Sequence, residues 1–351
     1  MHTEKSDPVI KFFVTVAGVI LIFAVMKELQ HIFIPLVAAV FLYFVFEPFN
    51  RVLKKHKFPE WLAILCDLLI MVGFLYGISN LIVNQFSQLS EALPEYILRL
   101  NNIISSTAVS FGIHDKILTD FSITEYLNSL DYSGFAENIF SSTVSVFSSV
   151  FLVLFFFIFV TSGYDNIVFV IKNRYEVSTK KKEEKKDGFV EDTFRSISNQ
   201  IQTYLGTKFL VSLLTAVLSG LALWIFGVDF VFVWIVITFL FNFIPNVGSI
   251  VAVILPALMS LVQFENFGYT LLIIIVISVI QNIIGNVIEP KIMGNKLGLN
   301  PIVILLSLLL WGYVWGITGM FLSVPLAGIL KIILAQSDSK NMKFISNLMG
   351  N

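Results

Sequence analysis

Apolar runs separated by short polar breaks occupy most of this chain and define eight hydrophobic segments. The first two, 12–26 and 32–46, have about 15 residues each, so they cross a bilayer as a tight pair if they extend slightly or the bilayer thins. Longer spans follow at 62–83, 143–171 and 204–226, and another begins at residue 268. Because helices satisfy their own backbone hydrogen bonds in lipid, the pattern predicts an all-α polytopic membrane protein with about six full transmembrane helices.

The two remaining segments, 230–262 and 301–335, are long for one straight crossing and carry helix breakers in their middles. Proline removes a backbone donor and glycine loosens a helix, so we expect each segment to break at membrane depth. An offset of 71 residues (298 − 227) relates the two, pairing Gly227 with Gly298, Pro245 with Gly316 and Gly248 with Gly319. Matched interruptions indicate a duplicated unit with a transporter's binding site at the breaks. Two ordinary helices, kinked to pack, are the alternative.

The distribution of cations predicts the orientation in the membrane. The loops 47–61 and 172–200 are basic and therefore cytoplasmic, whereas 84–142 carries two cations against seven acids and lies outside. The N-terminus is then inside. If both interrupted segments are re-entrant hairpins, Glu265 lies outside and Lys291 inside; if both cross fully, Lys291 falls outside. The positive-inside rule favours hairpins, because they place Lys291 inside, and the two repeats are then inverted. The C-terminus is cytoplasmic in either case.

These predictions divide the chain into seven parts. The parts are N-terminal transmembrane helices (1–83), an extracytoplasmic helical insert (84–142), a transmembrane helix (143–171), a cytoplasmic charged loop with an amphipathic helix (172–203), two repeats that each combine a transmembrane helix with a hairpin (204–263 and 268–335), and a cytoplasmic tail (336–351). Apolar residues at 89, 93, 97, 100 and 104 recur at helical spacing, so an amphipathic helix should continue out of the third span.

Composition supports the membrane assignment and excludes other classes. Hydrophobic residues make up 56% and charged residues 13% of the chain, about half the charge of a globular domain, and mean hydropathy is +0.85. The net charge of −1 gives no sign of nucleic acid binding, and the single Cys66 excludes an internal disulfide. All four histidines precede residue 115, and neither zinc-protease nor serine-hydrolase motifs occur. We therefore predict no enzyme, metal site or cofactor, and a first run retained as a signal anchor.

The polar groups inside the two repeats are mostly amides and hydroxyls, and they define the predicted solute site. Its residues cluster at the breaks and on one wall: Asn242, Pro245, Asn246, Gly248, Ser249, Gln281, Asn282, Gly316, Thr318 and Gly319. Gln281, Asn282 and Asn286 should share one side of a helix. The alternative is that these amides hold helices together. An uncharged, amide-lined cavity suits a neutral hydroxylated solute or a cation held by carbonyls.

Coupling to an ion would need a titratable group within the membrane, and two acids qualify. Asp67 lies within the third span and Glu289 near the end of the sixth, and an intramembrane acid is a candidate functional residue by default. Glu289 precedes Pro290, so it could instead end a helix near water. Lys208, one turn inside the fifth span, is predicted to snorkel to the interface.

Five sequence strings carry a resemblance to a known family. They are Tyr-Leu-Gly at 204–206, Asn-Phe-Ile-Pro-Asn-Val-Gly-Ser at 242–249, Asn-Val-Ile-Glu-Pro-Lys-Ile-Met-Gly at 286–294, Leu-Gly-Leu-Asn-Pro at 297–301 and Val-Pro-Leu-Ala at 324–327. With them the chain resembles the autoinducer-2 exporter (AI-2E) family of permeases of the bacterial cytoplasmic (inner) membrane. The resemblance implies export of a small signalling or metabolic solute and assembly into homo-oligomers, a pentamer being one arrangement. Some members are linked to sodium(lithium)/proton exchange, the second hypothesis. The inverted repeat favours alternating access over a passive channel.

Overall fold

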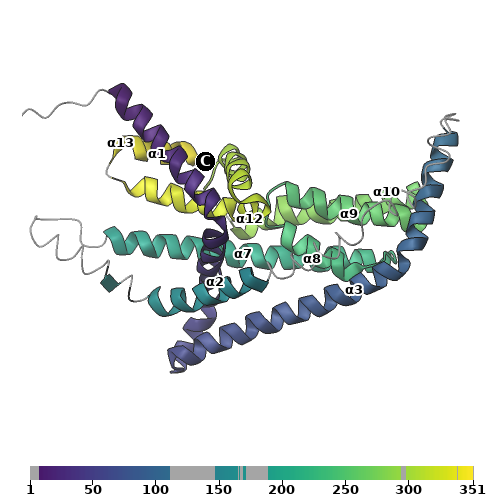
Figure 1. Ribbon diagram of the computed structural model, residues 1–351, viewed down its shortest axis with the longest axis horizontal. Helices are drawn as coiled ribbons and strands as arrows, with labels where there is room; N and C mark the ends of the chain where they lie inside the picture. The colour runs from purple at the N-terminus through teal and green to yellow at the C-terminus, as the bar shows by residue number, and fades with distance from the viewer. Residues whose placement is uncertain are drawn as a thin grey trace, which may run out of the picture. The chain divides into compact units, whose positions relative to one another are not determined.

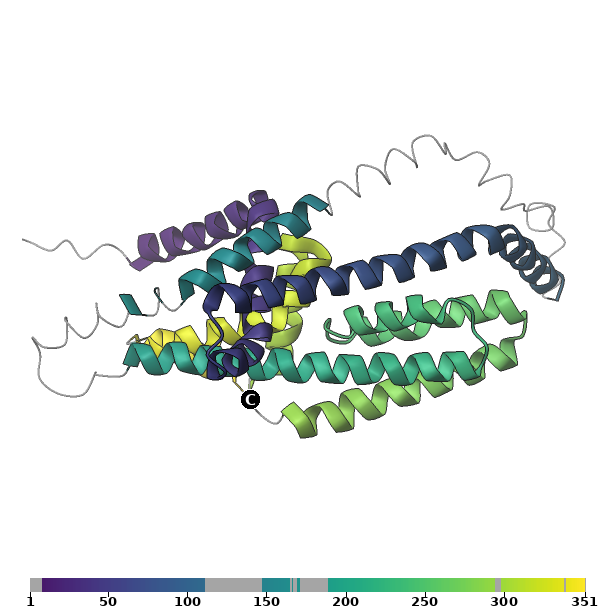
Figure 2. The same cartoon turned by 90° about the horizontal axis from the view of Figure 1, so that it is seen from below.

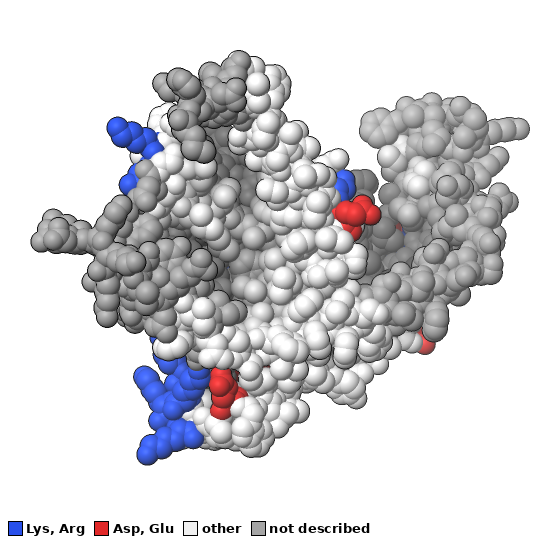
Figure 3. All heavy atoms as spheres, turned by 60° about the vertical axis from the view of Figure 1, so that its left-hand side comes forward, with Lys and Arg blue, Asp and Glu red and all other residues white. Residues whose placement is uncertain are grey.

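The computed structural model describes residues 8–110, 147–164, 166, 169–170, 189–293, 298–337 and 339–350. Regular structure in these ranges is helical apart from one isolated bridge between Leu299 and Gly350. Seven of the described helices are long and apolar enough to cross a membrane, which confirms the all-α polytopic class. Figure 3 shows that, on the face it presents, charged side chains gather in a few small groups, and the described surface between them carries none. The predicted features at 111–142 and 172–188 lie outside the described residues.

The chain forms two compact units whose parts alternate along the sequence. Unit 1 comprises Met1–Glu60, Val146–Gln202 and Leu297–Asn351, and unit 2 comprises Trp61–Ser145 and Thr203–Lys296. The boundary between Gln202 and Thr203 falls within one helix, α7 (Phe189–Ile225). The first interrupted segment therefore belongs to unit 2 and the second to unit 1.

Unit 1 contains α1 (Pro8–Glu28), α2 (Gln30–Lys55), a helix at Phe147–Tyr164, α12 (Pro301–Gln336) and α13 (Lys340–Met349). In Figure 1, α1, α12 and α13 lie together. The indole of Trp315 on α12 donates a hydrogen bond to the carbonyl of Met26 on α1 at 2.9 Å. Ring contacts join Tyr43 of α2 to Tyr164, so aromatic side chains fix much of this packing.

The helix α12 folds back on itself at its predicted break. Trp315 and Gly316 depart from helical geometry, and Gly316 has φ +61°. Ser307 Oγ donates to the carbonyl of Ser323 at 2.8 Å, although 16 residues of straight helix would hold them about 24 Å apart. The turn therefore brings the two halves of the segment side by side.

Unit 2 contains most of α3 (Glu60–Ser110), the later part of α7, α8 (Val231–Phe241), α9 (Val247–Phe264), α10 (Phe267–Ile283), a π-helical turn η1 (Ile284–Ile288) and α11 (Glu289–Met293). Figure 2 shows α3 (blue) and α8–α10 (green) lying along one another. The helix α3 continues unbroken past the third span, which confirms the predicted extension. The apolar core joins Leu223 and Val228 to Ile273 and Ile277.

Candidate functional site

The two ends of the first interrupted segment meet at one set of hydrogen bonds, here called the clasp, in which Gln263 binds Gly227 and Asp229. Gln263, in the last turn of α9, accepts a hydrogen bond from the backbone N–H of Asp229 at 2.9 Å through its Oε1. Its Nε2 donates to the carbonyl of Gly227 at 2.8 Å. Gly227 has φ +68°, a conformation that glycine adopts readily. Because residues 227–229 precede α8 and residue 263 ends α9, the segment returns to where it began.

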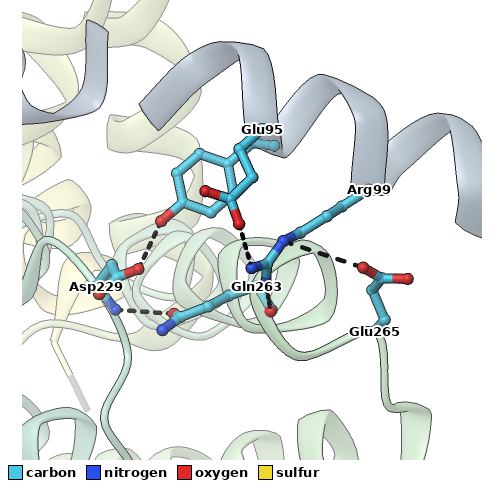
Figure 4. Close-up of polar contacts among 6 residues, drawn as sticks. Glu95, Arg99, Asp229, Gln263 and Glu265 are labelled. Atoms are coloured by element: carbon cyan, nitrogen blue, oxygen red, sulfur yellow. Dashed lines mark hydrogen bonds and ion pairs between the residues drawn. The ribbon is translucent and has the colours of Figure 1, made fainter. Parts of the chain in front are cut away.

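The extension of α3 packs against this clasp through Arg99. Its guanidinium donates to the backbone carbonyl of Gln263 and to Glu95 Oε1, the latter at 2.5 Å, and it lies 4.0 Å from Glu265. Figure 4 shows Arg99 pointing between these groups. The hydrogen bond to Glu95 raises the pKa of Arg99. The cation is thus held over the end of α9, where backbone carbonyls are free to accept.

Tyr96, one turn before Arg99, closes the other side of the clasp. Its hydroxyl donates to Asp229 Oδ2 at 2.5 Å, and its ring meets Phe230 edge-on at 6.1 Å. Burial, followed by the hydrogen bond to Asp229, raises the pKa of Tyr96, because ionisation would place two negative charges in contact. The α3 extension therefore binds both ends of the segment.

The tip of this segment is a tight turn between α8 and α9. Asn246 adopts φ +61° and is exposed, and Ser249 Oγ donates to its carbonyl at 3.0 Å. A Cβ on Gly248 would lie 1.8 Å from the carbonyl oxygen of Phe241, so only glycine allows the two helices to approach this closely. Pro245, in the turn itself, is half-buried. The predicted break is therefore present at the predicted residues.

Asn242 does not face open space but reaches α7. Its Nδ2 donates to Ser212 Oγ at 2.9 Å. Ser212 belongs to a row of buried polar side chains on α7, the α7 polar face, which consists of Lys208, Ser212, Thr215 and Ser219. Their spacing of four, three and four residues puts them on one side of the helix. This row meets the tip of the folded-back segment.

Lys208, at the end of the α7 polar face, pairs with a predicted coupling residue. Its Nζ lies 2.6 Å from Glu289 Oε1, and the two side chains are 8% and 19% exposed. The prediction that Lys208 snorkels to the interface is therefore wrong, because its ammonium is buried against a carboxylate. Glu289 opens α11 directly after η1 and has helical geometry, so it does not end a helix as the alternative for this residue expected. The pair lies one helical turn from the Ser212–Asn242 contact.

The three amides of the sixth span do not share one side of their helix. Gln281 is buried, whereas Asn282 and Asn286 are exposed. Asn286 Nδ2 donates to Asn282 Oδ1, and Asn282 Nδ2 donates to the carbonyl of Ser278, each at 2.9 Å. Asn286 therefore bonds to Asn282, and Asn282 bonds to the preceding turn of its own helix. Of the three amides, only Gln281 joins the interior of unit 2. Asp67, the other predicted coupling residue, is fully buried on α3.

The predicted residues of the second segment lie at the break of α12 in unit 1. Thr318 is exposed and Gly316 takes φ +61°. A Cβ on Gly319 would lie 1.9 Å from the carbonyl oxygen of Trp311, which parallels the contact of Gly248 in unit 2. The two glycines that were paired by sequence offset thus have the same local environment.

The α7 polar face was not predicted from the sequence. Its signal was present, because Ser212, Thr215 and Ser219 recur at helical spacing within an otherwise apolar span. Single hydroxyls are common in transmembrane helices, however, where they can bond to the preceding turn. Thr215 does so, since its Oγ1 donates to the carbonyl of Val211 at 2.7 Å. The spacing of all three, together with Lys208, was the feature that distinguished them.

Comparison with known proteins agrees with this architecture. The family model described as "AI-2E family transporter" matches residues 12–338. Two proteins described as candidate transport proteins, from Borreliella burgdorferi and Haemophilus influenzae, are 32% and 30% identical over 92% of this chain, covering 86% and 92% of their own lengths. The AI-2 transport protein TqsA of Escherichia coli is 27% identical over 93% of this chain and 92% of its own. The chain is therefore a multi-pass membrane transport protein that belongs to the AI-2E transporter family.

Proposed function

We propose that this transporter exports a small, uncharged polar solute across the bacterial inner membrane by alternating access. The observation that carries the proposal is the 2.9 Å hydrogen bond from Asn242 to Ser212, which joins the tip of the folded-back segment to the α7 polar face. Amides and hydroxyls both donate and accept hydrogen bonds, so they match hydroxyl and carbonyl groups of a neutral solute. Lys208 and Glu289 nearby neutralise each other, which disfavours a strongly anionic substrate. Because TqsA is named for AI-2 transport, autoinducer-2 is the first solute to test.

The proposal includes re-entrant hairpins. The eleven residues of α8 extend about 16 Å, which is short of the roughly 30 Å hydrocarbon core, and the clasp at Gln263 returns the segment to its starting point. We infer that α8–α9 enters and leaves on the outer face. After α10 crosses, α12 would enter from the cytoplasmic face, so the two repeats are inverted and both termini are cytoplasmic. Inverted repeats with broken helices are typical of alternating-access carriers.

Sodium(lithium)/proton exchange is the second candidate function, and the complete burial of Asp67 favours it. A buried carboxylate changes its proton or cation occupancy more readily than an exposed one does when its surroundings rearrange. Glu289 is the less favourable coupling residue, since an incoming ion would compete with Lys208 for the same oxygen. The family resemblance also supports homo-oligomers, which cross-linking in native membranes would test.

The decisive assay uses the full chain in proteoliposomes, with labelled autoinducer-2 and with proton and sodium gradients imposed separately. Wild type should move the solute, and Asn246→Gly should not. Glycine accepts the φ of +61° at this position, so the variant removes the amide while leaving the turn intact. Lys57→Gly is the matched control, because Lys57 is another exposed residue with positive φ (59°).

Four outcomes separate the alternatives. Loss of transport in Asn246→Gly with a normal Lys57→Gly supports the tip as a solute site. Wild-type transport by Asn246→Gly removes the tip amide from the site. Sodium/proton exchange without movement of any organic solute transfers the assignment to the antiporter. Unitary currents in planar bilayers would identify a passive channel.

A further inference from the structure

On two helices of unit 2 that pack against each other lie buried polar atoms with no hydrogen-bond partner among the described residues. They are Ser219 Oγ on α7 and Gln281 Nε2 on α10, and their residues are 1% and 7% exposed. Buried polar groups in folded proteins are nearly always hydrogen-bonded, so each exception requires a physical explanation. In lipid the requirement is stricter, because no bulk water reaches the group.

The end contacts of α7 and α10 place these two side chains about one helical turn apart along the helices. At one end Tyr269 Oη donates to the carbonyl of Phe226 at 2.9 Å, and at the other Lys208 contacts Glu289, so the helices are antiparallel. Between these contacts Leu223 and Ile277 share the apolar core. Gln281 lies twelve residues from Tyr269 and eight from Glu289, and Thr215 lies eleven from Phe226 and seven from Lys208, so Gln281 is level with Thr215 on α7. Ser219 lies one turn from Thr215, about 6 Å along α7, and is the next polar side chain of the α7 polar face.

We propose that Ser219 and Gln281 form a subsite for neighbouring hydroxyl or carbonyl oxygens of a neutral, hydroxylated solute. The inference rests on the proposed function and specifies which chemical groups the solute meets on its route through unit 2. The amide of Gln281 donates, and the hydroxyl of Ser219 donates or accepts. Thr215, one turn from Ser219, uses its proton on the carbonyl of Val211 and keeps lone pairs that can accept. An alcohol, which also both donates and accepts, is the complementary group.

The same groups discriminate against a bare cation. Metal cations such as sodium require acceptor oxygens around them, whereas the unpartnered atom of Gln281 is a donor nitrogen. Glu289, the acid that follows Gln281 two turns later along the same run of helix, is paired with Lys208. The pair Ser219 and Gln281 therefore favours a neutral polyol-like solute over sodium.

The test compares Ser219→Ala and Gln281→Leu with Ser260→Ala in the full chain. Ser260 is fully buried in the same unit, but its hydroxyl donates to the carbonyl of Ala257 at 2.9 Å and lies 3.3 Å from Thr270 Oγ1. Two quantities are measured for each protein: the concentration dependence of labelled autoinducer-2 transport, and the thermal midpoint in detergent without solute. Removing one solute contact should raise the apparent KM about three- to tenfold.

The two readouts distinguish a solute contact from a structural one. Ser219→Ala and Gln281→Leu should keep or raise the thermal midpoint, because each removes a polar group with no partner, while Ser260→Ala should lower the midpoint and leave KM unchanged. Variants that lower the midpoint as Ser260→Ala does and retain wild-type KM would overturn the subsite alone. Wild-type vesicles that move no autoinducer-2 would overturn the proposed function, and with it the solute class assigned to this pair.

Discussion

The side-chain amide of Gln263 donates a hydrogen bond to the carbonyl of Gly227 at 2.8 Å, across 36 residues of sequence. Unit 1 contains a similar closure, in which Lys331 Nζ donates to the carbonyl of Gly298 at 2.6 Å across 33 residues. Both glycines have positive φ, +68° and +51°, and they are the pair related by the offset of 71 residues. Two segments with different sequences thus close in the same way with different donors, which supports the proposed duplication.

The Gln263 clasp should stabilise the folded-back segment. Gln263→Leu leaves the carbonyl of Gly227 and the N–H of Asp229 without this partner, so we expect a loss of about 1–3 kcal/mol. Thermal unfolding in detergent measures the loss. Gln88→Leu, at an exposed position on α3, is the control and should be within about 0.5 kcal/mol of wild type. Equal midpoints for the two variants would show that the clasp contributes nothing.

Cysteine labelling tests the proposed membrane topology. In a Cys66→Ser background, an impermeant maleimide should label cysteine at Asn266 or Ser110 from outside the cell. Cysteine at Lys291 or Ser178 should react only after permeabilisation. External labelling at Lys291 would mean that both interrupted segments cross the membrane completely, and the repeat would not be inverted.

The breaks in the two interrupted segments should tolerate no side chain at Gly248 and Gly319, where the backbones of the two halves come into contact. Gly248→Ala and Gly319→Ala place a methyl group 1.8 and 1.9 Å from a backbone carbonyl oxygen, so the helices must separate. We expect each to lose at least about 2 kcal/mol, measured by thermal unfolding. Gly206→Ala and Gly285→Ala have open space around the added methyl group and should unfold near the wild-type temperature.

The Lys208–Glu289 pair should show strong coupling in a double-mutant cycle. Lys208→Met or Glu289→Gln alone leaves a buried charge unpaired and should destabilise the protein by about 3–5 kcal/mol. The double variant should recover most of that loss, because no charge remains. Additive losses would mean that the two side chains are solvated independently. Proton dependence of transport that survives in the double variant would exclude Glu289 as the coupling residue.

The Tyr96–Asp229 contact should fail at alkaline pH. Folding raises the pKa of Tyr96 above its unfolded value of about 10, so the protonated hydroxyl stabilises the folded protein fully below that pH. The stabilisation is lost as the pH rises through the raised pKa. Tyr96→Phe should therefore be less stable than wild type at pH 8, and the difference should shrink above pH 10. A constant difference across this range would mean that the hydrogen bond does not titrate.

Local signals in the sequence predicted the breaks well, because the reason for each break is local. Pro245 with Gly248, and Gly316 with Gly319, place two helix-weakening residues within four positions, and the structure turns at both places. Isolated prolines such as Pro256 remain inside a helix. The ion pair could not be predicted in this way. Lys208 and Glu289 are 81 residues apart, so their partnership depends on how α7 packs against α10, and each alone suggested a residue near an interface.

The amides of the sixth span illustrate the same limit. Ideal α-helical spacing was assumed for Gln281, Asn282 and Asn286, whereas burial separates Gln281 from the other two. Asparagine and glutamine carry the same amide group, so the sequence alone does not separate the two exposed asparagines from the buried glutamine. Only the packing of Ile277 and Gln281 against α7 distinguishes them.

The π-helical turn at Ile284–Ile288 works as an inserted residue that resets the angular phase of the helix. In an uninterrupted α-helix, Glu289 would point about 80° away from Gln281, since eight residues make slightly more than two turns. A π-turn winds more slowly, so it takes up most of this angle and brings Glu289 towards the direction of Gln281. One residue fewer would rotate α11 by about 100° and turn the carboxylate away from Lys208. The charge pair and the buried amide share one face because of a single extra residue.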